Sequence, residues 1–566
     1  MTGMPPVAAA HAFLSQLRDR GVEYLYLGSG SDTAPLVQAY EQAGRNGASY
    51  PQPVISAHES VAVGMAHGYA MVTGRGQAVM LHVSVGAANA VCGLVNAARA
   101  QVPMLFTAGR TPLHEQGPLG ARDSEIHWAQ EMYDQGGMVR EFVKWDYELR
   151  DGAQLGAVLD RALALAHTHP CGPVYLTLPR EVLAGQAPAP APALYGAAAA
   201  PSPDAQAVRE LAQALSRAAF PVIVCTASGA DPATVLPLVA LCERFGFGVA
   251  QARSRFTCFP DSHPLHLGHD PKPVHAQADA LLFLESDVPW VPARGAPQAE
   301  AFVAHAGTDP LFGRYPLRNH RSDLSLVTTV ANLLPALHAE LDALGADRGA
   351  GERRGRIEAA AQAQRDRVRE QIAADARRGG AITRVFATDC LARALPRDAI
   401  VVNEYPAARE CLPFDEPGRY FVHATSAGLG WGLPAALGAQ QAAPGRPVVA
   451  FLGDGSYLFA NPAACHHAAR LHGLPVVTVV FNNAGWGAVQ TAARNLYPAS
   501  DAPPGDTTAA LSSLAPMPDL ERYAEASGGL GLRVERREDL PAALERAFAT
   551  SRNEKRQVLV NVIGQG

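Results

Sequence analysis

The sequence predicts an α/β protein made of three doubly wound parallel-sheet domains. In each third of the chain, short apolar runs alternate with helix-like stretches, which is the pattern of parallel sheets covered by helices. Two linker-like stretches separate the thirds. Residues 186–203 are rich in Ala and Pro, and residues 345–380 are dense in Arg, Glu, Gln and Ala, with an exposed helix expected at 354–378. We therefore expect domains at 1–185, 204–344 and 381–566.

Composition narrows the class of protein. With 566 residues, of which 48% are hydrophobic and 18% charged, the chain fits a soluble globular enzyme of several domains. A net charge of −6 argues against nucleic acid as a main partner. We find no apolar stretch long enough to span a bilayer and no secretory signal, so we expect a cytoplasmic protein without a membrane partner. Eight scattered cysteines without a C-x-x-C pair indicate free thiols in a reducing compartment.

The first third carries polar residues where predicted strands end. A strand at 24–27 leads into a Gly-Ser loop that contains Ser31. Glu59 follows the strand at 53–56 and begins a helix, where an acidic residue alone would simply favour the positive end of the helix dipole. His82 ends the strand at 78–82, and a lone histidine in such a place is more often structural than catalytic.

The middle third is less informative. Strand-like runs at 221–226 and 280–284 predict another α/β sheet. Its residues include none that require a flavin. His263 and His305 are interpreted as structural.

The last third contains the pattern around which the chain is organised. An apolar run from Val449 ends in Gly453-Asp454-Gly455-Ser456, and a second run ends in Asn482-Asn483-Ala484-Gly485-Trp486. Between them, Asn461 can cap a helix and Pro462 suits its first turn. A strand–helix–strand unit places the two strands parallel and adjacent, so Asp454 and Asn483 should open on one crevice. Carboxylate and amide oxygens suit Mg²⁺, which usually shares its shell with phosphate oxygens.

These segments resemble the thiamine-diphosphate motif of the decarboxylase and acetohydroxyacid synthase superfamily. The other pieces match that superfamily in order over nearly the whole chain, closest to its benzoylformate decarboxylase-like members. The resemblance implies pyrimidine-binding, middle and diphosphate-binding domains in that order. It implies catalytic roles for Glu59, Ser31 and His82, and metal ligation by Asp454, Asn483 and the Gly485 carbonyl. The cofactor-binding set it implies is Glu59, Ala427, Leu429, Gly453, Asp454, Gly455, Ser456, Asn483, Gly485 and Trp486.

The implied function is Mg²⁺- and thiamine diphosphate-dependent, non-oxidative decarboxylation of a 2-oxo acid through an enamine intermediate. The implied assembly is a homodimer or homotetramer with active sites between subunits. A carboligase of the acetolactate synthase type that forms a 2-hydroxy ketone is the first alternative, and a cofactor-binding protein without turnover is the second. Some family members bind FAD in the middle domain, but nothing in this sequence supports it. A nicotinamide dehydrogenase is disfavoured, because no G-x-G-x-x-G opens a strand–helix unit with a suitable acidic residue downstream.

Overall fold

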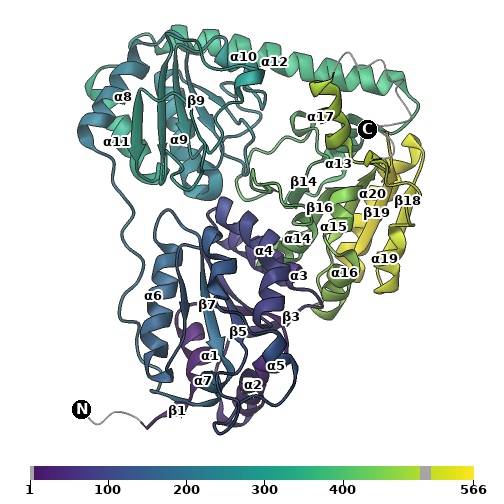
Figure 1. The fold of residues 1–566 in the computed structure, drawn as a ribbon. Helices are drawn as coiled ribbons and strands as arrows, with labels where there is room; N and C mark the ends of the chain where they lie inside the picture. The colour runs from purple at the N-terminus through teal and green to yellow at the C-terminus, as the bar shows by residue number, and fades with distance from the viewer. Residues whose placement is uncertain (1–4, 498–510, 566) are drawn as a thin grey trace.

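The computed structural model describes residues 5–497 and 511–565 and contains three parallel β-sheets, one in each predicted domain (Figure 1). In all three sheets every strand pairing is parallel. The predicted fold class is therefore confirmed, whereas the exact domain boundaries stay a prediction. None of the helices in the described ranges is long and apolar enough to cross a membrane.

The first domain has a six-stranded sheet in the order β3-β2-β4-β5-β7-β6. The chain winds outward from β2 in one direction and from β4 in the other, so the crevice for a ligand lies at the carboxyl ends of these two strands. Its elements are β1 (Val7–Ala8), α1 (Ala9–Asp19), β2 (Tyr24–Gly28), α2 (Ala34–Asn46), β3 (Gln52–Ile55), α3 (Glu59–Thr73), β4 (Gln77–Leu81), α4 (Val83–Arg99), β5 (Met104–Arg110), α5 (Ile126–Ala129), β6 (Asp146–Glu148), α6 (Leu155–His167), β7 (Pro173–Pro179), α7 (Arg180–Ala184) and β8 (Gln186–Ala187).

The second domain has a five-stranded sheet in the order β10-β9-β11-β12-β13. A long helix, α12, leaves this domain and crosses to the third, as Figure 1 shows along the upper edge of the molecule. It begins four residues before the predicted helix and ends where predicted. The elements are α8 (Ala205–Arg217), β9 (Pro221–Cys225), α9 (Val235–Phe245), β10 (Gly248–Ala250), α10 (Lys272–His275), β11 (Ala280–Leu284), β12 (Phe302–Gly307), β13 (Leu324–Val327), α11 (Val330–Ala343) and α12 (Ala350–Arg378).

The third domain has a six-stranded sheet in the order β15-β14-β16-β17-β19-β18, with its reversal between β14 and β16. Its elements are α13 (Arg384–Ala394), β14 (Ile400–Glu404), β15 (Tyr420–Val422), α14 (Gly432–Ala442), β16 (Val448–Gly453), α15 (Asp454–Phe459), α16 (Pro462–Leu471), β17 (Val477–Asn482), α17 (Gly487–Leu496), α19 (Glu521–Ala526), β18 (Leu530–Val534), α20 (Leu540–Glu554) and β19 (Val558–Ile563).

The predicted strand–helix–strand unit is confirmed, with one correction. β16 and β17 are parallel neighbours, in register at Val449 and Val477. The connection holds two helices instead of one, because Asn461 takes a left-handed conformation (φ 53°) and interrupts the run between α15 and α16. Pro462 occupies the first turn of α16 as expected, but the Asn461 side chain makes no capping hydrogen bond.

The first and third domains share one hydrophobic core through the crossing of α3 and α14. Glycines allow the two helix backbones to approach closely. A Cβ built on Gly68 would lie 1.9 Å from the Ala435 carbonyl oxygen, and one on Gly438 would lie 1.9 Å from the Met65 carbonyl oxygen. This crossing fixes the relative orientation of the two domains.

Candidate active site

The carboxyl edge of the third sheet brings together the residues predicted to hold a metal. Asp454 is the first residue of α15, directly after β16, and only 3% of its surface is exposed. Gly485 donates its N–H to Asp454 Oδ2 at 3.3 Å, so the turn that contains Asn483 and Gly485 lies against this carboxylate. The structure therefore places the three predicted ligands at one point.

The two neighbouring asparagines differ in what they can do. Asn482 is buried, accepts the Ala484 N–H and donates to Asn561, so its amide is used to hold the turn. Asn483 is only partly buried. The second asparagine is thus the better placed of the two to offer its oxygen to a ligand.

Asp454 is a buried carboxylate that forms no salt bridge with a basic side chain anywhere in the described ranges. Burial raises its pKa, and backbone N–H groups from residue 455 and from 483–485 oppose that effect. A buried charge of this kind is costly without a partner. A carboxylate, an amide oxygen and a main-chain carbonyl form an all-oxygen donor set, which fits Mg²⁺.

Small residues around Asp454 leave room for a further group. A Cβ on Gly455 would lie 2.2 Å from the indole ring of Trp486, so this glycine lets the ring close over the start of α15. Gly453 ends β16, and a Cβ there would meet nothing closer than the Ser456 hydroxyl at 4.0 Å. Ser456 itself is buried.

The loop before α14 carries Ala427 and Leu429, and two polar side chains hold it in place. Ala427 has a positive φ of 52°, a strained conformation for a residue with a Cβ. Asn96 of α4 accepts the Gly428 N–H at 3.1 Å and donates to the Gly428 carbonyl at 2.8 Å. Leu429 is half-buried at the centre of this loop.

Glu404 at the end of β14 fixes the next turn of the same loop. It accepts the N–H groups of Gly430 at 2.9 Å and Gly432 at 2.6 Å, and its burial raises its pKa to about 7. Ser456 also hydrogen bonds to this carboxylate, which ties the loop to α15. Glu404 carries no predicted role from its sequence context.

Glu59, Ser31 and His82 meet at the carboxyl edge of the first sheet. Glu59 begins α3, as predicted, and accepts a hydrogen bond from the Asn89 amide at 3.1 Å. Its side chain lies close to Gly28, which ends β2, and to Gly86, which belongs to α4. Ser31 is exposed in the loop after β2.

His82 has a charged partner that sequence analysis did not identify. Its Nδ1 lies 2.6 Å from Oδ1 of Asp32, whose side chain is 4% exposed. This hydrogen bond is the largest cause that raises the pKa of His82. Gly30 is needed for the contact, because a Cβ there would lie 2.1 Å from His82 Nδ1. Asp32 stands beside Ser31 in the Gly-Ser loop, and that position was the signal available in the sequence.

Backbone strain accompanies this pair. Val83, directly after His82, has a φ of 32°, which is unusual for a β-branched residue. Its N–H donates to Asp32 Oδ2 at 3.4 Å. Strain of this kind is concentrated at functional sites, where the surrounding structure must hold it.

Helix α4 links the two edges. Asn89 binds Glu59, and Asn96 binds the loop at Gly428. The two asparagines are seven positions apart, or about 10 Å along the helix.

His263 and His305 lie in the second domain, away from both edges. His305 is 2% exposed, stacks on Phe283 and bonds to the Arg321 carbonyl, and His263 pairs with Glu243. The expectation that both are structural agrees with these contacts. All eight cysteines are free in the structure.

Three parallel sheets, with oxygen donors gathered on one sheet edge and titratable side chains on another, define an α/β protein of the class that binds ligands at the carboxyl ends of its strands. Two family models specify the class further: the N-terminal TPP-binding domain of thiamine pyrophosphate enzymes matches residues 7–138, and the C-terminal TPP-binding domain matches residues 404–562. The chain belongs to the thiamine pyrophosphate enzyme family.

Curated relatives cover nearly the full chain. Benzoylformate decarboxylase of Pseudomonas aeruginosa is 29% identical over 95% of this chain and 96% of its own. Sulfoacetaldehyde acetyltransferase of Castellaniella defragrans is 25% identical over 99% and 94%, and acetolactate synthase of Mycobacterium bovis is 26% identical over 96% and 86%.

Solved structures share the fold. A thiamine diphosphate-dependent 4-hydroxybenzoylformate decarboxylase of Rhodococcus jostii superposes with a TM-score of 0.77 at 23% identity, covering 99% of both chains. Benzoylformate decarboxylase of Polynucleobacter necessarius gives a TM-score of 0.79 at 20% identity, again covering 99% of both chains. The relatives thus include both lyases and transferases.

Proposed function

We propose that this chain catalyses the non-oxidative decarboxylation of a 2-oxo acid with thiamine diphosphate and Mg²⁺. The observation that carries the proposal is the His82–Asp32 pair beside Glu59 on one sheet edge. It supplies a proton donor whose pKa is raised by a buried carboxylate. Release of an aldehyde requires a proton at the carbon that loses carbon dioxide, whereas ligation to a second carbonyl compound does not use that proton.

Asp454, Asn483 and the Gly485 carbonyl would hold the Mg²⁺, and the glycines and Ser456 at the start of α15 would lie against the diphosphate. Ala427, Leu429 and Trp486 would contact the remainder of the cofactor. Bound there, thiamine diphosphate supplies an electron sink for the electrons released with carbon dioxide. Glu59 would exchange a proton with the pyrimidine end, where a positioned carboxylate contributes about 10²–10⁴ in rate.

His82 would deliver the proton that completes the reaction. The Asp32 carboxylate accepts the hydrogen bond from Nδ1 and favours the protonated ring, which leaves Nε2 as the proton donor. Ser31, exposed in the same loop, would bind the substrate carboxylate or relay the proton. Asp32 acts through His82 and is therefore a positioning residue.

We also propose a homo-oligomer, a homodimer or homotetramer, in which Glu59 of one chain reaches the cofactor held by another. The proposal rests on the resemblance to the thiamine pyrophosphate enzyme family, in which the pyrimidine domain of one subunit meets the diphosphate domain of another. Sedimentation velocity with parallel activity measurements tests it: turnover should fall on dilution together with the oligomer. Full turnover by a sedimenting monomer would overturn it.

The reaction is tested with purified protein, Mg²⁺, thiamine diphosphate and a panel of 2-oxo acids. Benzoylformate comes first, because relatives carrying that activity in their name match the whole chain. Pyruvate is included, alone and with an added aldehyde, because acetolactate synthases also match. Carbon dioxide with an aldehyde supports the proposal. A 2-hydroxy ketone as sole product would replace it with a carboligase, and binding of the cofactor without turnover of any acid would leave a binding protein.

A further inference from the structure

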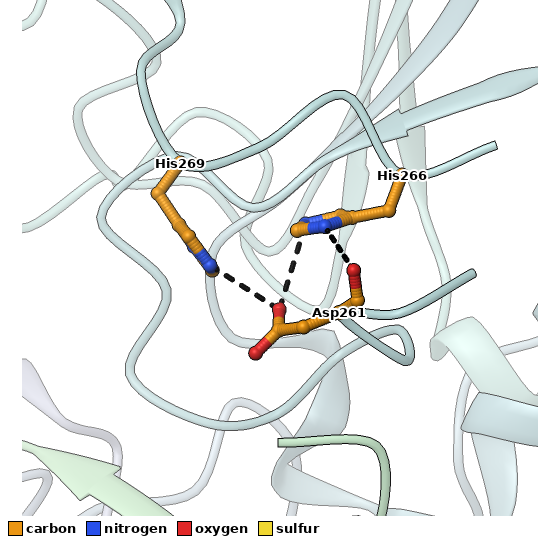
Figure 2. A group of neighbouring side chains, drawn as sticks. All are labelled: Asp261, His266 and His269. Carbon is orange, nitrogen blue, oxygen red and sulfur yellow. Dashed lines mark hydrogen bonds and ion pairs between the residues drawn. The ribbon is translucent and has the colours of Figure 1, made fainter. Parts of the chain in front are cut away.

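A second cluster of ligating side chains lies in the second domain, on the segment that follows β10. Asp261, His266 and His269 point toward one another, as Figure 2 shows. Their side chains are 6%, 5% and 8% exposed. One oxygen of the aspartate and one nitrogen of each histidine all lie within 4.8 Å of one another.

The hydrogen bonds of the two imidazoles fix which nitrogen carries a proton. His266 Nδ1 lies 3.1 Å from the Asp261 carbonyl, and His269 Nδ1 lies 3.3 Å from the Gln251 carbonyl. A carbonyl only accepts, so both Nδ1 atoms donate and both neutral rings keep a lone pair on Nε2. A backbone carbonyl that holds the distal ring nitrogen is the usual second partner of a metal-binding histidine.

Both Nε2 lone pairs face the same carboxylate oxygen. Asp261 Oδ1 lies 3.6 Å from His266 Nε2 and 3.2 Å from His269 Nε2. In a tetrahedral zinc site with bonds of about 2.0–2.1 Å, neighbouring ligand atoms are about 3.3 Å apart. A charge-assisted N–H···O bond would be shorter, at about 2.7–2.9 Å. The spacing therefore fits a shared metal ion better than a shared proton.

The Gln251 side chain leaves the lone pair of His266 Nε2 available to a metal ion. Its amide oxygen accepts the Cys258 N–H at 2.7 Å, which directs its NH₂ group toward the cluster. That group has two protons and three acceptors nearby: Asp261 Oδ1 at 2.7 Å, the Phe259 carbonyl at 2.9 Å and His266 Nε2 at 3.2 Å. The two oxygens are closer, so the His266 lone pair is the surplus acceptor.

The cluster sits where the second domain meets the third. Asp261 Oδ2 pairs with Arg409 at 2.8 Å and accepts the Phe414 N–H at 2.7 Å. A cavity of about 470 Å³ borders the cluster, and His266, His269 and Cys411 are among its lining residues together with part of α12. The cavity offers an entry path and space for a water as a fourth ligand.

We propose that Asp261, His266 and His269 bind a divalent metal ion of the zinc class at the junction of the second and third domains. The ion is distinct from the Mg²⁺ proposed at Asp454, since imidazole nitrogen suits zinc and its neighbours whereas Mg²⁺ prefers oxygen. By binding Oδ1 of Asp261, the ion would fix the orientation of the carboxylate whose Oδ2 links the second domain to Arg409 and Phe414 of the third.

Metal uptake by the full chain, saturated with Mg²⁺ and thiamine diphosphate, tests the proposal. Protein stripped with a zinc-selective chelator is titrated with Co²⁺ and read by visible d–d absorption, and Zn²⁺ is then added to displace it. His269→Gln and His266→Gln remove one ligand each. His263→Gln is the matched control, because His263 lies on the same segment but pairs with Glu243 outside the cluster.

We expect one Co²⁺ per chain in the wild type and in the control, at least about tenfold weaker binding in the two ligand variants, and a rise of Tm with Zn²⁺ only where binding persists. Circular dichroism and Mg²⁺-dependent cofactor binding check that the variants fold. Equal Co²⁺ uptake by His269→Gln overturns the proposal, as does an ultraviolet thiolate-to-cobalt band that would place the ion on cysteines. Absence of Co²⁺ uptake by the wild type also overturns the proposal. That result would indicate that a proton on His269, and not a metal ion, lies between His269 Nε2 and Asp261 Oδ1.

Discussion

Replacing Asp32 by Asn tests the proton donor proposed for this site. The two side chains have the same shape, so Asn fits the tight space beside Gly109, where a Cβ built on the glycine would lie 1.7 Å from Asp32 Oδ2. The amide oxygen can keep the hydrogen bond from His82, but the NH₂ group then replaces the Oδ2 that accepts the Val83 N–H at 3.4 Å. The substitution therefore removes the charge beside His82 together with this long hydrogen bond.

The size of the effect follows from the hydrogen bond. A bond to a charged group contributes about 1.5–3 kcal/mol and a neutral one about 0.5–1.5, so the lost charge is worth about 1–1.5 kcal/mol. Asp32 is 4% exposed, so solvent screens little of this. At about 1.4 kcal/mol per tenfold change in rate, kcat should fall about tenfold at neutral pH. His82→Ala removes the donor itself and should cost about 10²–10⁴.

The pH profile gives the second readout. Asp32 raises the pKa of His82, so the pair stabilises the fold below the ordinary histidine pKa, and this stabilisation is lost as pH rises through the raised pKa. Without the charge, the alkaline limb of kcat should move to lower pH, and the variant should approach wild type under acidic conditions. Asp151→Asn, at an exposed turn, is the matched control and should leave the profile unchanged.

A double variant tests whether Asp32 acts through His82. In the His82→Ala background, Asp32→Asn should cause no further loss of carbon dioxide release, because its effect passes through His82. A tenfold loss that persists in that background would refute the role given to Asp32. An unshifted alkaline limb in the single variant would refute the role given to His82.

Three further changes probe the rest of the molecule. Glu59→Gln should lower kcat about 10²–10⁴-fold with little change in Tm, and unchanged turnover would contradict its role in proton transfer. Asp454→Asn should weaken Mg²⁺-dependent cofactor binding more than about tenfold by calorimetry, whereas equal heats with and without the substitution would exclude it as a ligand. Gly68→Ala should lower the free energy of unfolding in urea by about 1–3 kcal/mol through its clash with Ala435, while Gly44→Ala, in open space on α2, should raise it by about 0.5–1 kcal/mol.

The sequence was sufficient to predict the sheets and the common edge at which Asp454 and Asn483 lie, because both depend on local order. Apolar runs ending in Gly-Asp-Gly and Asn-Asn predict parallel strands whose ends coincide, and β16 and β17 confirm that arrangement. Glu59 was placed at the start of a helix for the same reason, and α3 begins there.

What was missed depends on contacts between distant parts of the chain. Asp32 meets His82 across 50 positions, and no local pattern joins them. Glu404 acquires its function by accepting N–H groups from a loop 26 residues later. Asn461 was predicted to cap one helix, but its backbone is left-handed and its side chain forms no capping hydrogen bond. The Asp261 cluster also escaped notice, because its ligands converge only when the segment folds against β10.

The glycine-lined crossing of α3 and α14 has a consequence for mutational surveys of this family. Any side chain at Gly68 or Gly438 forces apart two backbones that hold separate domains in place. A survey that scores only growth or product formation would rank these glycines with Glu59 and Asp454. A parallel survey of protein abundance would separate them, since the glycine variants should be depleted from the cell while the acidic-residue variants accumulate as inert enzyme.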